Sequence, residues 1–387
     1  MCYDKYMSII IFIVILLVLV VSHEFGHFIV AKMNKIRVDE FSFGFPPRIW
    51  GKKIGETTYN LNALPFGGYV KIYGENLDEA DFVEVGFLDK DKTPEKVEEE
   101  SRSLAYKPKY IQALVLVAGV VMNFLVAWLL LSVGFMSGLP SSVGMAPKGA
   151  IVENQALTIT SVLSGSPAEI SGIKIGDKIL SLDTPTDSTK LLSSNFGAES
   201  VQTFVKNHNG QEINVSLVRG KEPINIKVTP KINKTGDSVM IGISMDTIGT
   251  LKLPIHKAVW EGLKLTSDLT VGTAVGFYKL ISNAVIGKGD MSAVTGPIGI
   301  VGAVGDAAKF GFIYLLSFTA LISVNLAVIN LLPFPALDGG RLLFLLIEKI
   351  KGSRIKPQIA NWVNMIGFGL LMLLMVFITY HDIVKLL

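Results

Sequence analysis

The chain has 387 residues, 50% of them hydrophobic, and a mean hydropathy of +0.47. This composition is too apolar for an ordinary soluble enzyme and favours a membrane protein. The net charge of +3 is small and no basic cluster is interleaved with aromatic residues, so nucleic acid is not an expected partner. The single cysteine, Cys2, excludes an intrachain disulfide framework and a metal site built from several cysteines.

Four apolar stretches are long enough to cross a hydrocarbon core, which takes roughly 20 helical residues. The first could be mistaken for a cleaved signal peptide, but it lacks a small-residue cleavage site and carries His23 and Glu24 within its helical pattern. We therefore expect four membrane helices. They cover approximately Ser8 to Ala31, Ile111 to Phe135, Phe312 to Leu332 and Ile359 to Tyr380.

Basic residues predict the orientation of these spans. Lys32, Lys35 and Arg37 closely follow the first span, whereas Asp4 and Lys5 before it cancel. Because positive charge accumulates on the cytoplasmic side, the end of the first span is expected in the cytoplasm. The basic connection 341–356 after the third span is expected on the same side.

The segment 36–110 between the first two spans is therefore expected in the cytoplasm. Residues 36–45 and 57–73 are rich in β-branched and aromatic residues with Gly-Gly and Pro punctuation, which predicts short strands. Residues 78–103 are dominated by acidic residues and lysine, which is typical of a solvated helix or a flexible loop.

The segment 138–253 is expected on the exterior side. Residues 157–162 and 213–218 alternate in period two, and turns are expected at Asn209-Gly210 and Gly220-Lys221, so a small strand-rich domain is predicted. Within 254–310, apolar residues up to Ile286 recur at roughly helical spacing. This spacing predicts an amphipathic helix on the membrane surface or against the bundle.

The sequence His23-Glu24-Phe25-Gly26-His27 lies inside the first span. Two histidines four residues apart differ by about 40° around a helix, so both imidazoles leave one face and can share a metal ion. Zinc suits such ligands, and Glu24 is placed to act as general base on a metal-bound water. A chance occurrence is the alternative, but unpaired ionisable residues are costly inside a membrane.

A third ligand is expected from the end of the third span. Asp338 is the sole carboxylate near that segment, Pro333 and Pro335 interrupt the helix, and Gly339-Gly340 allows the backbone to turn. Irregular backbone of this kind is tolerated in membranes where it lines a polar cavity. The alternative is that Asp338 only caps the helix that begins near Arg341; we favour zinc coordination.

At these residues the sequence resembles the site-2 family of intramembrane metalloproteases, and more closely its bacterial branch of the regulator of sigma-E protease type. The resemblance extends over nearly the whole chain, and its short motifs are specific because they occur in this order. Besides H-E-F-G-H and N-L-L-P-F-P-A-L-D-G-G they are Phe43-Gly44-Phe45, the stretch Pro65 to Lys71, Ala118-Gly119 with Asn123, and Gly296 to Ile300.

The resemblance implies that His23, His27 and Asp338 bind one Zn²⁺ and that Glu24 activates the water. It also implies that Asn325 and Asn330 line the cleft and hydrogen-bond the substrate or the developing oxyanion; interhelical hydrogen bonding is the alternative for both. The strand containing Gly68, Tyr69 and Val70 resembles the membrane-associated β element of the family, which would pair with an extended substrate.

Residues 156–230 resemble a PDZ domain, in the stretches Ser164 to Ala168 and Gly172 to Leu180. Two features depart from the family. The best-known enterobacterial relatives have two PDZ domains in tandem where this chain has room for one, which puts the mode of substrate gating in doubt. Val120 stands where a proline often follows Ala-Gly, a change that should be tolerated.

The sequence thus predicts a polytopic α-helical membrane protein with an exterior PDZ-like domain and a small cytoplasmic membrane-associated β element. We expect a zinc endopeptidase of the bacterial inner membrane that cuts single-span membrane proteins, such as anti-sigma factors or signal-peptide remnants. A non-enzymatic PDZ-bearing scaffold and a metal transporter are the alternatives; Glu24 argues against the scaffold. The four membrane segments are expected in 1–35, 111–137, 311–345 and 346–387. The cytoplasmic region with the β element is expected in 36–110, the exterior segment with the PDZ-like domain in 138–253, and the amphipathic helical segment in 254–310.

Overall fold

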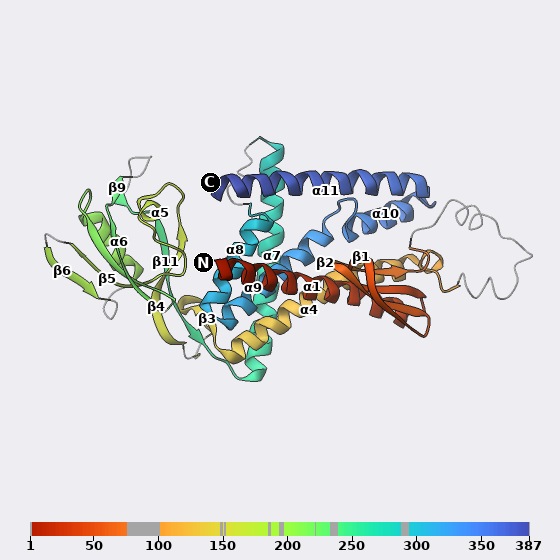
Figure 1. Ribbon diagram of the computed structural model, residues 1–387, viewed down its shortest axis with the longest axis horizontal. Helices are drawn as coiled ribbons and strands as arrows, with labels where there is room; N and C mark the ends of the chain where they lie inside the picture. Colours follow the sequence, from red (N-terminus) through yellow and green to blue (C-terminus); the bar gives the residue numbers. More distant parts are fainter. Residues whose placement is uncertain are drawn as a thin grey trace, which may run out of the picture. The chain divides into compact units, whose positions relative to one another are not determined.

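The computed structural model describes residues 2–75, 101–147, 150, 152–184, 187–192, 197–220, 222–232, 239–287 and 294–386. Two compact units make up the chain (Figure 1). The helical unit comprises Met1–Ser132, Val259–Ala308 and Leu315–Leu387, and the strand-rich unit comprises Val133–Ala258 and Lys309–Tyr314. The acidic part of the predicted segment 78–103 lies mostly outside the described residues.

Among the residues that the structure describes, four helices are long and apolar enough to cross a membrane, so the chain is a multi-pass membrane protein. The candidate spans are Tyr6–Met33, Lys109–Ser137, Phe312–Leu331 and Pro357–Val384, and they confirm the four predicted membrane helices. The long helices and their shorter neighbours are α1 (Cys2–Met33), α4 (Lys109–Ser137), α7 (Ile255–Val285), α8 (Pro297–Phe310), α9 (Phe312–Leu331), α10 (Asp338–Lys351) and α11 (Pro357–Leu386).

A β element follows α1 and consists of β1 (Val38–Ile54) and β2 (Thr57–Ile72). Residues of β1 pair with β2 on both sides, because Glu40 pairs with both Thr58 and Lys71. The end of β2, including Val70, therefore lies on one side of β1 and the start of β2 lies on the other. Ile36, Val38 and Ile72 pack into one buried cluster with residues of α1 and α4, which fixes this element against the helices.

The strand-rich unit contains a seven-stranded sheet with the order β3-β11-β4-β5-β7-β8, and β6 pairs with β5 off this path. The predicted period-two segments 157–162 and 213–218 fall in β4 and β7, whose inward residues share one core with Val201 and Phe204 of α6. The elements are β3 (Leu139–Ser142), β4 (Val152–Val162), α5 (Pro167–Ile170), β5 (Lys178–Thr184), β6 (Asp187–Leu192), α6 (Ala198–Asn207), β7 (Ile213–Arg219), β8 (Glu222–Val228), β9 (Lys231–Ile232), β10 (Val239–Met240) and β11 (Ile243–Leu251).

The sheet extends beyond the predicted 156–230 domain, since β3 and β11 lie outside that range. β11 pairs with β3 on one side and with β4 on the other, so it is an internal strand of the sheet. A buried ion pair also stabilises this unit: Asp177 is fully buried, and both of its oxygens lie 2.7 Å from donors of Arg219.

Candidate active site

His23 and His27 lie on one face of α1, as their spacing predicts, and both are buried. Their Nε2 atoms are 3.1 Å apart. The Oδ2 atom of Asp338 lies 3.0 Å from Nε2 of His23 and 3.3 Å from Nε2 of His27. Three possible ligand atoms from α1 and α10 therefore meet at one point, within 4.8 Å of one another.

The loop between α9 and α10 brings Asp338 to the histidines. The loop backbone folds tightly on itself, because a Cβ atom on Gly339 would lie 2.2 Å from the carbonyl oxygen of Leu332 and one on Gly340 would lie 2.2 Å from that of Phe334. Ala336 has a φ of +73°, which is unfavourable for a residue with a side chain. Its N–H donates to Oδ1 of Asn364 in α11 at 3.2 Å, which holds this conformation.

The capping alternative for Asp338 is not supported by its geometry. The N-cap position of α10 is Leu337, and Asp338 is the first residue of the helix. Burial alone would raise the pKa of Asp338, but hydrogen bonds with His23 and His27 lower it to about 2. The side chain is therefore an anion that faces two imidazoles, as a metal ligand requires.

The other ring nitrogen of each histidine has a partner that orients the ring. Nδ1 of His27 lies 2.8 Å from the carbonyl oxygen of Val115, and Nδ1 of His23 lies 3.3 Å from the side-chain amide of Asn123. Asn123 is fully buried, and its Oδ1 atom has no partner among the described residues. Turning the amide by 180° would place Oδ1 against the Nδ1–H of His23, the arrangement expected when Nε2 binds a metal.

Gly119 of α4 provides the space that the two rings occupy. A Cβ atom at this position would lie 2.4 Å from Nε2 of His27 and 2.7 Å from Nε2 of His23. Sequence reasoning singled out Gly119 and Asn123 only as motif residues, without a role. The signal in the sequence was a glycine and an amide four residues apart, on one face of an apolar helix. Such a pair could leave space for the histidine rings and hydrogen-bond one of them.

Glu24 lies beside the three ligand atoms and beside the end of β2. Its Oε2 atom accepts a hydrogen bond of 3.0 Å from the backbone N–H of Val70. Glu24, His27, Val70, Asp338 and other residues line a cavity of about 210 Å³. Glu24, two of the three candidate ligands and the edge of β2 therefore share one small polar cavity.

Of the remaining predicted site residues, Asn330 reaches the candidate ligands, whereas Asn325, Tyr69 and Gly68 contact other parts of the structure. The Nδ2 atom of Asn330 lies 3.5 Å from Nε2 of His23, so this amide reaches the ligand cluster. Asn325 instead accepts a hydrogen bond of 3.4 Å from the hydroxyl group of Thr273 in α7. The hydroxyl group of Tyr69 donates to Glu40, and Gly68 packs so closely on β1 that a Cβ atom would lie 2.7 Å from the carbonyl oxygen of Ser42.

The donor set fits zinc. Two imidazole nitrogens and one carboxylate oxygen are the protein ligands of a class of catalytic zinc sites in which the fourth position stays open for water. The buried partners of both Nδ1 atoms fix the rings with Nε2 toward the ligand cluster, as such sites require.

Comparison with known proteins shows the family of the chain. The model of peptidase family M50 matches residues 11–374. A zinc metalloprotease of Clostridium perfringens (strain 13 / Type A) is 35% identical over 366 residues, which are 95% of each chain. One of Nostoc sp. (strain PCC 7120) is 33% identical over 384 residues, or 98% of this chain and 97% of the relative. The regulator of sigma-W protease RasP of Bacillus subtilis (strain 168) is 30% identical over 442 residues, or 98% of this chain and 99% of the relative.

The match of the family model covers the histidine pair of α1, the loop with Asp338 and all or part of each of the four membrane helices. The similarity to the curated relatives likewise extends over almost the full length of both chains. The chain therefore belongs to peptidase family M50 and is an intramembrane zinc metalloprotease.

Proposed function

We propose that His23, His27 and Asp338 hold the zinc ion, that Glu24 is the general base, and that the substrates are single-span membrane proteins. The observation that carries this proposal is the convergence of the three ligand atoms beside Glu24 and the edge of β2. A base next to a metal-ligand cluster suits hydrolysis of a peptide bond, whereas binding alone does not require Glu24.

The residues of the site have separate roles in the proposed hydrolysis. A zinc ion held by His23, His27 and Asp338 would supply Lewis acidity and lower the pKa of the attacking water. Glu24 would take a proton from the attacking water and pass it to the nitrogen that leaves when the peptide C–N bond breaks. Val115 and Asn123 orient the imidazoles. Asn330, whose Nδ2 atom lies 3.5 Å from Nε2 of His23, would donate from its amide to the oxyanion.

The edge of β2 is placed to bind an extended substrate. Val70 pairs with Phe41 of β1, yet its N–H points to Glu24, so this backbone group faces the catalytic cavity. A substrate strand that pairs with residues 68–70 would lie directly beside the base. Strand pairing also unwinds a helical substrate, which exposes the peptide bond for attack.

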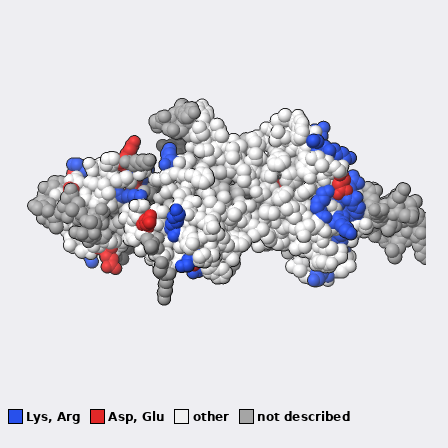
Figure 2. Space-filling view, turned by 90° about the horizontal axis from the view of Figure 1, so that it is seen from below, with Lys and Arg blue, Asp and Glu red and all other residues white. Residues whose placement is uncertain are grey.

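We infer that the zinc site lies near the cytoplasmic face. Figure 2 shows blue side chains gathered at the end of the helical unit that carries β1, β2 and α10, next to a broad surface without charges. Lys32 lies in the last turn of the first span and Lys35 follows this span, whereas Lys349, Lys351 and Lys356 follow the third. Because positive charge favours the cytoplasmic side, the strand-rich unit belongs on the exterior side.

The strand-rich unit is proposed to act as a PDZ-like size filter. Separated from the zinc by the membrane, it would exclude substrates with a bulky exterior domain and admit trimmed ones. Removing residues 139–251 with a short linker, which takes out the whole sheet, should spare cleavage of trimmed substrates and increase cleavage of untrimmed ones. Loss of cleavage of the trimmed form by a folded, zinc-loaded chain would instead indicate a recruiting role.

Anti-sigma factors already trimmed by another protease and remnant signal peptides are the proposed substrate classes. Both are single apolar spans with little exterior mass, which suits a filter. One relative is named as a regulator of sigma-W protease, a name that connects that protein with sigma-factor control.

The test is cleavage of a panel of tagged single-span proteins by the detergent-purified chain, with and without a zinc chelator. We expect cleavage within or at the edge of the span, loss of cleavage with chelator, and recovery when zinc is restored. A Glu24→Gln variant that binds substrate without cutting it is the matched control. Absence of cleavage of every substrate by the zinc-loaded wild-type chain would contradict the proposed substrate class.

A further inference from the structure

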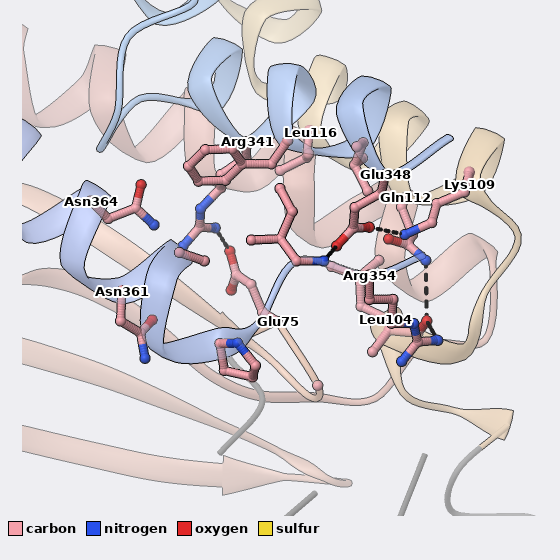
Figure 3. A pocket seen from close by; sticks show the side chains of 17 residues that line it. Glu75, Leu104, Lys109, Gln112, Leu116, Arg341, Glu348, Arg354, Asn361 and Asn364 are labelled. Carbon is pink, nitrogen blue, oxygen red and sulfur yellow. Dashed lines mark hydrogen bonds and ion pairs between the residues drawn. The ribbon is translucent and has the colours of Figure 1, made fainter. Parts of the chain in front are cut away.

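A second pocket adjoins the catalytic cavity in the helical unit. It has a volume of about 170 Å³ and is formed by residues near the end of β2, by α4 and the residues before it, by α10 and the start of α11, and by Arg354 and Ile355 between these two helices (Figure 3). Four residues line both spaces, so a single wall separates them: Glu75, Leu104, Leu116 and Arg341.

That wall contains an ion pair. Arg341 lies on the first turn of α10 and pairs with Glu75, just after the end of β2 (Figure 3). Leu104 and Leu116 form the rest of the shared wall. A substrate chain that reaches the catalytic cavity therefore lies next to the second pocket.

The charges that line this pocket do not cancel. Lys109, Arg341 and Arg354 are cationic, whereas Glu75 and Glu348 are the carboxylates. Lys109 pairs with Glu348 and Arg341 pairs with Glu75. Three positive charges minus two negative charges leave one positive charge, on Arg354.

Arg354 is fixed in place but incompletely satisfied. Its Nη2 atom donates to the carbonyl oxygen of Ala105 at 2.8 Å, and its guanidinium carbon lies 5.6 Å from the centre of the Tyr106 ring. Its Nη1 atom is buried and has no hydrogen-bond partner among the residues that the structure describes. A buried cationic N–H group without an acceptor is costly, so the site favours an anionic acceptor.

We propose that this pocket is a substrate subsite for a carboxylate carried by the polypeptide being cut, and that Arg354 is the residue that binds it. The source is an acidic side chain near the scissile bond or the new C-terminus released by hydrolysis. This inference deepens the proposed function, because it assigns a substrate preference to the same active site.

The rest of the lining suits such a group. Phe344, Leu345 and Ile355 provide apolar surface for the methylene groups that precede a carboxylate, and Asn361 and Asn364 provide polar groups at the same pocket. The carboxylate would reach Arg354 from the catalytic cavity past the Glu75–Arg341 pair. A planar guanidinium group with one free NH₂ edge is well suited to a carboxylate.

The experiment compares single-span substrates that carry Glu or Gln at each position around the cut, with the detergent-purified full chain. We expect Glu to raise kcat/KM about tenfold or more at one position, as a hydrogen bond to a charged group allows. In parallel, a product peptide ending in a free carboxylate is compared as an inhibitor with the same peptide ending in an amide. A carboxylate preference in either arm, lost in Arg354→Gln, supports the subsite and identifies its source.

Two further variants protect the interpretation. Lys351→Gln removes one exposed positive charge from the last turn of α10, which ends before Arg354, and should leave the preference unchanged. Arg354→Lys keeps the positive charge but loses the planar guanidinium group, so it should retain part of the preference. This variant replaces Arg354→Gln in the test if Arg354→Gln folds poorly.

Cleavage without any carboxylate preference, or a preference that survives in a folded Arg354→Gln chain, would overturn the subsite. An Arg354-dependent effect that follows the anionic lipid content of vesicles instead of the peptide would also overturn it, in favour of a headgroup site. Failure to cut any substrate would count against the proposed substrate class, a result distinct from loss of the preference.

Discussion

Replacement of Gly119 by alanine should abolish tight zinc binding, although the change adds only one methyl group to α4. The new Cβ atom would lie 2.4 Å from Nε2 of His27 and 2.6 Å from Cε1 of His23. Neither ring can turn away freely, because Val115 and Asn123 hold the opposite nitrogens. The clash therefore falls on the atoms that are proposed to bind the metal.

The size of the effect follows from these distances. Ordinary van der Waals contact begins at 3.4 Å, so Nε2 of His27 must move by 3.4 minus 2.4, or 1.0 Å, relative to Gly119. Metal–ligand distances tolerate only about 0.2 Å of change. Loss of one ligand bond from a site with three protein ligands should weaken zinc binding by about 100-fold or more, which corresponds to about 2.7 kcal/mol.

Competition with a chromogenic chelator measures this affinity in the detergent-purified chain, with metal content determined by mass spectrometry. Gly369→Ala in α11 is the matched control, because a Cβ atom at Gly369 meets nothing within 4 Å. Thermal unfolding and size-exclusion profiles show whether both variants fold. A folded Gly119→Ala chain that bound zinc within threefold of the wild-type affinity would refute the proposed ligand geometry.

Three other substitutions test separate parts of the structure. Glu24→Gln should keep the zinc content and lower cleavage by about 100-fold or more, since it removes the base but no ligand; retention of more than about a tenth of the wild-type rate would reject this role. Asn123→Ala should lower zinc affinity by about 10- to 100-fold, because His23 loses its orienting partner. An unchanged chelator titration would show that the contact between Asn123 and His23 is not needed for zinc binding. Arg219→Ala should destabilise the strand-rich unit by about 3 kcal/mol, because the fully buried Asp177 loses its ion-pair partner. Denaturant unfolding measures this change in the free energy of unfolding. A loss of stability below about 1 kcal/mol would indicate that water replaces the guanidinium group.

The membrane helices were predictable because a long apolar run is a local property of the sequence. The structure confirms four helices of that kind together with β-sheet. The pairing of both sides of β1 with β2 was not predictable, since it depends on Glu40 pairing with both Thr58 and Lys71, which lie near opposite ends of the same strand. The same limitation applies to β11, whose place between β3 and β4 is set by pairing across about a hundred residues.

The predicted ligands His23, His27 and Asp338 are brought together by the structure, although their metal binding stays a prediction. Their chemistry could be inferred because few side chains of this type occur in membrane spans. The supporting contacts could not be inferred. A backbone carbonyl group such as that of Val115 has no sequence signal, and the place of Asn325 beside Thr273 depends on how α7 packs against α9.

The contacts of α11 with the loop that carries Asp338 have a consequence for biogenesis. Asn364 holds the N–H of Ala336, and Gly367 leaves room for Pro335, because a Cβ atom there would lie 2.5 Å from the Cβ atom of that proline. A ribosome makes α11 after every other described helix, so these supports arrive only when the last span enters the bilayer. We therefore expect a nascent chain that lacks α11 to be proteolytically silent, which would protect neighbouring proteins at the insertion site during synthesis.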